Sequence, residues 1–314
     1  GLVGSEMCIR DRILTYQAVL EVLAMMPSLI EHFDEASKRW QDLAIFMQEK
    51  KFIADTDNEI KSENQEDKQS KDVQLLLKDL AYGYDKVLLR DINLSIKKGN
   101  KTLIVGTSGW GKSTLFYVLM RLLYPLKGNI FIQGKNYDDL AEKSIREHFA
   151  VAFQEHHIFN LSIRDNFKML YENITDEEIY KSLENVYLLD FVKQVGLDYI
   201  VGNDGNKLSG GQKHRLQLAI CLAKQKDIIL LDEPTAGLDI KTTNNICSQL
   251  MEKYQKQTMI VTSHDISLLR FFDDIIICGE EKIIEQGNIK KLLLREDSYL
   301  NKLIRYKNLS LIHI

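Results

Sequence analysis

The chain has 314 residues, of which 45% are hydrophobic and 27% are charged, and this composition is typical of a folded globular protein. The net charge of −4 gives no reason to expect nucleic acid binding. The cysteines lie far apart without metal-type spacing, which predicts reduced, mostly buried thiols in a cytosolic compartment (Cys8, Cys221, Cys247 and Cys278).

Both ends of the sequence resemble translated sequencing-adaptor read-through. Residues 1–12 read GLVGSEMCIRDR and residues 309–314 read LSLIHI. We therefore expect that neither segment evolved with the rest of the chain and that the reading frame is truncated. No functional interpretation depends on either segment.

Residues 13–53 are expected to form one long helix that begins apolar and ends amphipathic. Gln17, Glu21 and Pro27 interrupt its start, so the run falls short of a clear membrane span of about 20 apolar residues. Two interpretations stay open: a surface helix that packs on the next domain, or the end of a last membrane helix with its cytosolic extension. Residues 54–71 are crowded with charge and predict a flexible linker.

From residue 72 to residue 308 the pattern is that of an α/β domain. Short apolar runs predict strands over 75–80, 87–96, 102–105, 129–134, 149–153, 228–231, 259–262, 275–278 and 282–285. The pattern from about 155 to 226 predicts an inserted helical subdomain, and further helices are expected over 241–254 and 288–303. The strand-rich start, the α/β core and the helical insertion together predict an α/β fold.

A glycine-rich segment lies between the strand at 102–105 and an apolar helical run. It consists of Gly106, Thr107, Ser108, Gly109, Trp110, Gly111, Lys112, Ser113 and Thr114. Glycines let the backbone fold closely around a polyphosphate, and the N-terminus of the following helix adds a partial positive charge. The segment therefore predicts a P-loop, in which Lys112 reaches the β- and γ-phosphates and Ser113 binds Mg²⁺.

Two carboxylates, Asp232 and Glu233, end the apolar strand at 228–231. In a parallel sheet this end lies at the same edge as the P-loop. Asp232 suits the shell of a Mg²⁺ ion, and Glu233 is placed to orient or deprotonate a water that attacks the γ-phosphate. The alternative is an acidic pair that caps the next turn.

The segment Leu208-Ser209-Gly210-Gly211-Gln212 opens a predicted helix. Ser209 and the two glycines at a helix N-terminus predict a second anion site. The alternative is that Ser209 only caps the helix.

These three motifs, in this order and spacing, resemble the ATPase domain of ABC transporters over about residues 72–305. Gln154, after the strand Phe149–Phe153, matches the Q-loop glutamine of that family. Asp239 matches the D-loop, and His264 matches the switch histidine. Tyr84 lies where the family has its adenine-stacking aromatic residue, with Tyr82 as the close competitor.

The resemblance implies a P-loop NTPase core with an antiparallel β subdomain and an inserted α-helical subdomain, and ATP and Mg²⁺ as cofactors. It assigns catalysis to Lys112, Gln154, Glu233 and His264. It assigns nucleotide contacts to Tyr84, to residues 106–114, to Gln154, to Ser209, Gly210, Gly211 and Gln212, and to Asp239. It assigns the metal to Ser113, Gln154 and Asp232. It also implies that two such domains, identical or different, pair head-to-tail, so that Ser209 of one chain contacts the phosphate held by Lys112 of the other.

Two further segments resemble exporters within this family. Residues 201–206 (VGNDGN) are similar to the cross-loop pattern Val-Gly-Glu-x-Gly, with Asn203 in place of the glutamate, and residues 158–166 are similar to the segment after the Q-loop. Exporters fuse membrane helices to the N-terminal side of the ATPase. The resemblance therefore implies a half-transporter fragment at the inner or plasma membrane, with its ATPase domain in the cytoplasm and a transmembrane domain as partner.

Three alternatives stay open at this point. A stand-alone importer ATPase would lack the helix at 13–53. A non-transport ABC ATPase of the DNA-repair or chromosome type usually carries a long coiled coil between the P-loop and the Ser209 motif, and none is predicted here. A non-hydrolysing regulatory module disagrees with the presence of Glu233 and His264.

Overall fold

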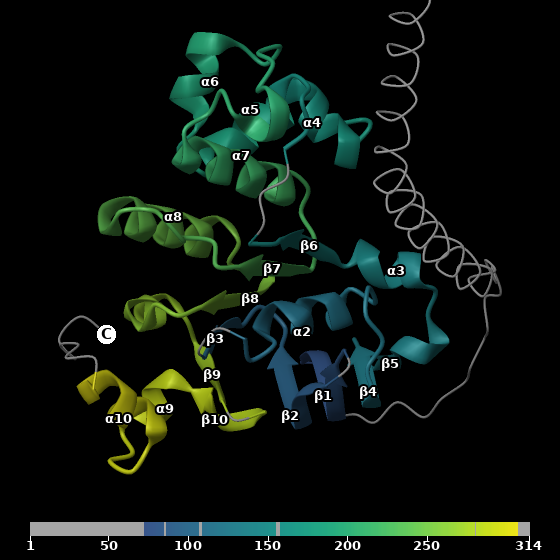
Figure 1. Cartoon of the computed structure of the whole chain (residues 1–314), viewed down its shortest axis with the longest axis vertical. Helices are drawn as coiled ribbons and strands as arrows, with labels where there is room; N and C mark the ends of the chain where they lie inside the picture. The colour runs from purple at the N-terminus through teal and green to yellow at the C-terminus, as the bar shows by residue number, and fades with distance from the viewer. Residues whose placement is uncertain (1–71, 85, 107–108, 155–157, 280, 307–314) are drawn as a thin grey trace, which may run out of the picture. The chain divides into compact units, whose positions relative to one another are not determined.

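The structure is a computed structural model that describes residues 72–84, 86–106, 109–154, 158–279 and 281–306 (Figure 1). The expectations for residues 1–12, 13–53, 54–71 and 309–314, and for Thr107 and Ser108, lie outside these described residues. Within the described ranges, no helix combines the length and apolar character that crossing a membrane requires.

The described strands form two sheets. The smaller sheet is antiparallel, has the order β2-β1-β4-β5, and consists of β1 (Val73–Gly83), β2 (Val87–Lys97), β4 (Lys127–Ile132) and β5 (Lys135–Asn136). The larger sheet has the order β10-β9-β3-β8-β7-β6. Its strands are β3 (Lys101–Val105), β6 (Phe149–Ala152), β7 (Ile228–Asp232), β8 (Thr258–Ser263), β9 (Asp274–Gly279) and β10 (Lys282–Asn288). Only β10 pairs antiparallel within this sheet.

Burial explains the different sequence patterns of the two sheets. In β2, Ile92, Leu94 and Ile96 are buried and alternate with exposed residues, as expected for an antiparallel strand with one wet face. In β3, β7 and β8 every residue is buried, because helices or strands cover both faces of the central parallel strands.

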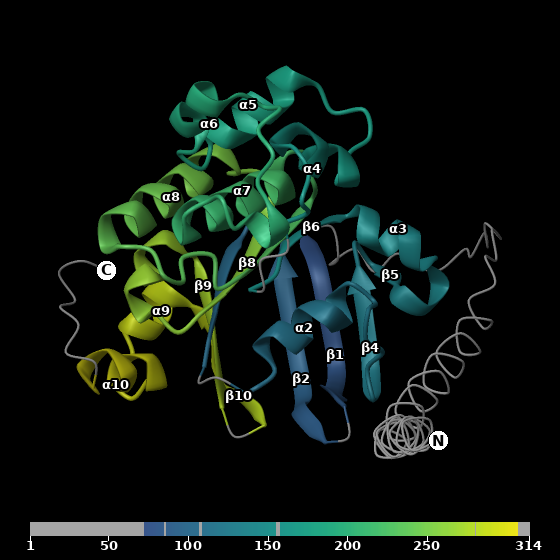
Figure 2. The same ribbon diagram turned by 45° about the horizontal axis from the view of Figure 1, so that its top comes forward.

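Helix α2 (Lys112–Leu119) lies between the two sheets (Figures 1 and 2). Its Phe116 and Leu119 share one core with Leu75 of β1 and with Ile104 and Leu230 of the larger sheet. Since neighbouring residues of a strand face opposite ways, Leu103 and Leu231 point to the other face. That face packs on α7 (Gly210–Leu222) and α8 (Ile240–Lys253).

A block of helices lies between β6 and β7 in the sequence and forms a separate layer in both views (Figure 2). It consists of α4 (Ile163–Leu170), α5 (Asp176–Glu184), α6 (Leu189–Val195), the 3-10 turn η3 (Asn203–Gly205) and α7. Side-chain caps begin these helices where the sequence offers them: Ser162 caps α4, and Thr175 with Glu178 forms a capping box on α5. Three short elements lie outside this block: η2 (Tyr137–Asp139), α3 (Glu142–Glu147) and η4 (Ile266–Phe271).

Asn166 on α4 holds the chain that enters the helical block. Its Nδ2 donates to the carbonyls of Phe159 (3.1 Å) and Ser162 (2.9 Å), and its Oδ1 accepts from the Phe159 N–H (2.9 Å). We expect Asn166→Ala to lower the free energy of unfolding by about 2 kcal/mol, because these groups lose their partner while partly buried. Urea denaturation measures the change, and Asn203→Ala, at an exposed position, is the control. Equal stability of the two variants would contradict this role for Asn166.

The C-terminal helix differs from the prediction. Residues 288–303 do not form one helix but two short ones, α9 (Ile289–Leu293) and α10 (Tyr299–Tyr306). Asn301 explains the break, since its Nδ2 donates to the carbonyls of Leu293 (3.1 Å) and Arg295 (2.7 Å) and so satisfies the end of α9. Ser298 Oγ accepts from the Asn301 N–H (3.1 Å) within the first turn of α10.

The α/β class is confirmed: an antiparallel sheet, a mostly parallel sheet and an inserted helical block are present. The topology brings the ends of β3, β7 and β8 to one edge of the larger sheet, because these strands are parallel neighbours. This edge carries most of the predicted site residues.

Candidate functional site

The P-loop connects β3 to α2. Lys112 is the first residue of α2 and is buried, and its Nζ donates to the carbonyl of Gly106 at 2.7 Å. Gly111 precedes the helix as its N-cap without a side-chain hydrogen bond, and the first turn of the helix contains no acidic residue. Its first N–H groups therefore meet no carboxylate of their own helix, which fits an anionic ligand.

The structure gives physical reasons for two of the glycines. A Cβ on Gly106 would lie 2.7 Å from the carbonyl oxygen of Cys278, closer than real contacts allow. Gly111 has φ +75°, and a Cβ there would lie 3.0 Å from Leu88 Cβ and 3.2 Å from Tyr82 Cε2. The loop therefore runs against β9 on one side and against the smaller sheet on the other.

Tyr82 and Tyr84 have different environments. Tyr82 is 1% exposed, burial raises the pKa of its phenol well above the usual value, and its hydroxyl donates to the carbonyl of Gly111 at 3.0 Å. Tyr84 is 60% exposed and follows the end of β1. Of the two competitors for a ring that stacks on a base, only Tyr84 presents its side chain to solvent, while Tyr82 supports the P-loop from below.

Asp232 and Glu233 lie at the end of β7, two strands away from β3. Both are buried, at 3% and 7% exposure. Glu233 has φ +50°, which is unusual for a residue with a side chain. Its Oε1 lies 2.7 Å from Nδ1 of His264, whose own side chain is 63% exposed. The structure thus brings Glu233 and His264 into direct contact at the sheet edge.

Thr262 contacts both acidic residues, although its sequence position alone does not mark it as a site residue. Its hydroxyl donates to Asp232 Oδ1 and accepts from the Glu233 N–H (3.2 Å). Thr262 lies in an apolar strand, where a threonine also satisfies β propensity, so the sequence alone gives little signal for this contact. The parallel register that places Thr262 beside Asp232 could have revealed it.

Ser209 forms a capping box at the start of α7. Its Oγ accepts from the Gln212 N–H (3.3 Å), and Gln212 Oε1 accepts from the Ser209 N–H (2.9 Å). Gly210 and Gly211 form the first turn, which contains no acidic residue. The alternative prediction for Ser209, helix capping, is therefore present in the structure, and an anion can still approach the helix end beside the exposed Ser209 and Gly210.

The segment around Ser209 opens α7 and the P-loop opens α2, and these two helices lie on opposite faces of the larger sheet. Helix α2 packs in the core between the sheets, whereas α7 packs on the other face. The structure therefore gathers Lys112, Asp232, Glu233 and His264 at one edge, and places Ser209 in another layer.

Asp239 and Gln154 are the remaining predicted residues in the described ranges. Asp239 caps α8, where Oδ1 accepts from the Thr242 N–H (2.9 Å). Hydrogen bonds from the Thr242 side chain and backbone lower the pKa of Asp239, so it is ionised at neutral pH. Gln154 is exposed and follows the end of β6.

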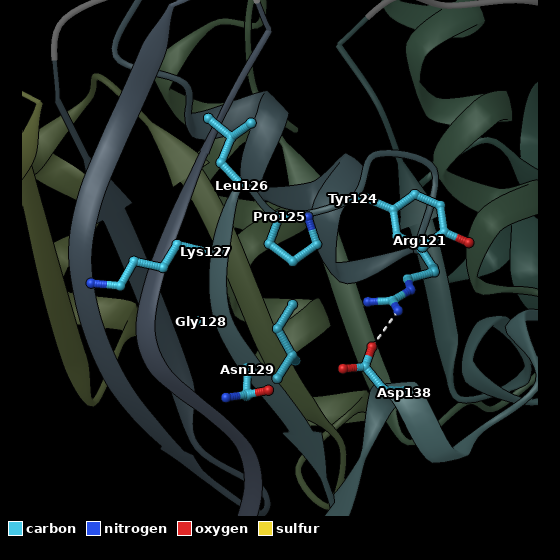
Figure 3. A pocket seen from close by; sticks show the side chains of 9 residues that line it. Arg121, Tyr124, Pro125, Leu126, Lys127, Gly128, Asn129 and Asp138 are labelled. Carbon is cyan, nitrogen blue, oxygen red and sulfur yellow. Dashed lines mark hydrogen bonds and ion pairs between the residues drawn. The ribbon is translucent and has the colours of Figure 1, made fainter.

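A hollow between the end of α2 and the start of β4 contains none of these residues (Figure 3). Arg121 and Asp138 form an ion pair in it, and the Arg121 guanidinium lies 4.4 Å from the centroid of the Tyr124 ring. The charges of Arg121 and Asp138 thus neutralise each other. The sheet edge is therefore the better candidate for a ligand site.

The residues at the sheet edge fit a magnesium nucleotide. Lys112 and the uncapped start of α2 suit phosphate, and Asp232 at the end of β7 supplies a carboxylate oxygen of the kind that Mg²⁺ prefers. Burial raises the pKa of Cys278, beside Gly106, to about 11, so this thiol stays protonated and adds no negative charge.

Similarity to known proteins identifies the family of this chain. Residues 89–236 match the ABC transporter family. The β-(1→2)glucan export ATP-binding/permease protein NdvA of Agrobacterium vitis is 34% identical over 206 residues, which is 65% of this chain and 35% of that protein. The glutathione/L-cysteine transport system ATP-binding/permease protein CydC of Escherichia coli (strain K12) is 34% identical over 230 residues, which is 72% of this chain and 40% of that protein.

Among solved structures, a bacterial Atm1-family ABC exporter with ATP bound has a TM-score of 0.71 and 28% identity. The match covers 76% of this chain and 42% of that one. The chain thus spans well under half the length of the relatives named here. These relatives favour the exporter interpretation over an importer or DNA-repair ATPase. The chain belongs to the ABC transporter family and contains an ATP-binding domain of the exporter type.

Proposed function

We propose that this chain binds and hydrolyses Mg²⁺·ATP in a head-to-tail pair of such domains and that hydrolysis drives export through a membrane domain. The observation that carries the proposal is the buried Glu233 carboxylate in contact with His264, at the same sheet edge as Lys112. A buried carboxylate held by a histidine at a phosphate-binding edge is well placed to activate an attacking water.

In this proposal the P-loop holds the phosphates. Lys112 exchanges the Gly106 carbonyl for the β- and γ-phosphate oxygens, and the N–H groups at the start of α2 bind the same anion. Ser113, Asp232 and Gln154 hold Mg²⁺, which when bound neutralises charge on the phosphates. Tyr84 stacks on the adenine with its exposed ring.

Glu233 serves as the general base. His264 occupies Oε1 of Glu233 at 2.7 Å, so Oε2 is the oxygen that takes a proton from the attacking water. Base catalysis of this kind contributes about 10²–10⁴-fold. His264 fixes the direction of the carboxylate and, because its side chain is exposed, can also reach the γ-phosphate.

A second domain completes the site. The packing of α2 and α7 on opposite faces of the larger sheet supports a role for Ser209 and its glycines toward an ATP held by another chain. The Ser209 Oγ accepts a hydrogen bond from Gln212, so its own O–H can donate to a phosphate. Asp239 fixes the exposed loop before α8, which faces the same partner in this arrangement.

The shared site is tested by mixing two inactive variants. Ser209→Arg and Lys112→Ala should each reduce ATP turnover to the background level. If the site is shared, each mixed pair contains one intact site, so an equal mixture should regain up to about a quarter of wild-type turnover. Phosphate release measures this, and the fraction of mixed pairs is counted with two affinity tags.

The outcome separates two arrangements. If Ser209 acts within its own chain, mixed pairs contain no intact site and the mixture stays inactive. Tight nucleotide binding by Ser209→Arg is also expected, since its own P-loop is intact; loss of that binding would contradict the assignment.

For the whole protein we propose a half-transporter at the inner or plasma membrane, with the ATP-binding domain in the cytoplasm. Residues 13–53 would be the end of its last membrane helix and a cytosolic extension, and residues 54–71 a linker. The named relatives, which are ATP-binding/permease proteins, support this organisation.

A further inference from the structure

Thr262 lies beside Asp232 and Glu233, the two acidic residues of the site. It is fully buried on β8, and the parallel register pairs it directly with Asp232 on β7. Side chains in register on neighbouring strands lie on the same face, so the hydroxyl and the carboxylate meet at the end of the sheet.

The Thr262 hydroxyl donates a hydrogen bond to one residue and accepts a hydrogen bond from another. The O–H donates to Asp232 Oδ1, while the same oxygen accepts from the Glu233 N–H at 3.2 Å. The carbonyl of Thr262 also accepts from this N–H, at 3.1 Å. One side chain thus connects the predicted metal ligand with the predicted general base.

Both neighbours need such a contact. A buried carboxylate is unfavourable unless its oxygens receive hydrogen bonds, and Asp232 is only 3% exposed. Glu233 has φ +50°, a conformation that is unfavourable for a residue with a side chain and that persists only when surrounding contacts hold it. The bifurcated hydrogen bond from its N–H to Thr262 is such a contact.

We propose that Thr262 is a positioning residue for the acidic pair, an inference that rests on the proposed function of the site. By donating to Oδ1 of Asp232, it fixes the direction of the carboxylate that would hold Mg²⁺. By holding the Glu233 N–H, it keeps the Glu233 side chain directed at His264. Hydrogen bonds to metal ligands typically change metal affinity or activity about 10–100-fold.

The test compares Thr262→Val, which keeps the shape and removes the hydroxyl, with Thr262→Ser, which keeps the hydroxyl. Thr258→Val is the matched control, because Thr258 is equally buried at the other end of β8 and its Oγ1 accepts from the Gly99 N–H at 3.0 Å. Each substitution is made separately in the full chain. Mg²⁺ is titrated against a fixed concentration of a fluorescent ATP analogue, starting in EDTA, and melting temperatures are recorded in parallel.

We expect Thr262→Val to need at least about 10-fold more Mg²⁺ for half-saturation and to lower turnover by a similar factor. Thr262→Ser should stay within about threefold of wild type in both measurements. Thr258→Val should lose thermal stability, as any lost buried hydrogen bond does, without a change in Mg²⁺ requirement.

Two results would overturn the proposal. The first is a Thr262→Val protein with reduced melting temperature but with the Mg²⁺ requirement of the Thr258→Val control, since the role would then be structural only. The second is a Mg²⁺ requirement that is unchanged or lower in Thr262→Val. Failure of the proposed function looks different: the wild-type chain would then bind the nucleotide without any effect of Mg²⁺ or would show no turnover.

Discussion

Replacing Glu233 with Gln is expected to lower ATP turnover at least about 100-fold while ATP affinity stays within about threefold of wild type. The amide keeps the size of the side chain and its place beside His264, but it cannot take the proton of the attacking water. Because the phosphate-binding groups remain, ATP should accumulate in the bound state and hold two chains together. Phosphate release, equilibrium nucleotide binding and size-exclusion chromatography with ATP measure the three effects.

Glu252→Gln is the control for this substitution, because Glu252 is an exposed residue on α8 away from the sheet edge. It should leave all three measurements unchanged. Turnover of Glu233→Gln close to the wild-type rate would remove Glu233 from its proposed role. Loss of ATP binding in that variant would instead make Glu233 a structural residue of the strand end.

Replacing Lys112 with Ala is expected to weaken ATP binding at least about 100-fold, which corresponds to about 2.7 kcal/mol. Each hydrogen bond from a charged donor contributes about 1.5–3 kcal/mol, and the ammonium is proposed to reach two phosphates. The buried Nζ already lies over the P-loop, 2.7 Å from the Gly106 carbonyl, so little ordering is needed on binding. Titration with a fluorescent ATP analogue measures the affinity.

Lys98→Ala provides the comparison, since Lys98 is an exposed lysine in the turn before β3. It should bind ATP as the wild type does, which would show that the loss comes from position 112 and not from overall charge. Melting temperatures of both variants without nucleotide should stay close to wild type. Retained affinity in Lys112→Ala would contradict the P-loop assignment.

Much of the fold could be predicted because local pattern and tertiary environment agree. Central parallel strands such as β7 are buried on both faces, and their unbroken apolar runs are visible in the sequence. The prediction was wrong over 288–303, where an apolar helical pattern continues through a break. Asn301 ends α9 through hydrogen bonds to the carbonyls of Leu293 and Arg295, which a residue-by-residue propensity does not contain.

For the candidate site, the positions that carry characteristic chemistry could be identified from the sequence motifs, and their roles stay predictions. It could not separate Tyr82 from Tyr84, because only the end of β1 decides which ring is buried. No sequence motif identifies Thr262, for a related reason. Its contact with Asp232 depends on the register between β7 and β8, which the sheet as a whole determines. Thr262 itself lies 30 residues from Asp232 along the chain.

The same register limits how the site-bearing strands can change over evolution. Successive residues of β7 face opposite sides, so a single inserted or deleted residue would turn Asp232 to the other face and separate it from Thr262. Apolar side chains in β7 can be exchanged for others of similar volume at a modest loss of stability. The number of residues in β7 cannot change without this loss of register. Variation in chain length among functional descendants should therefore be confined to the surface turns, and these two strands should keep a constant residue count.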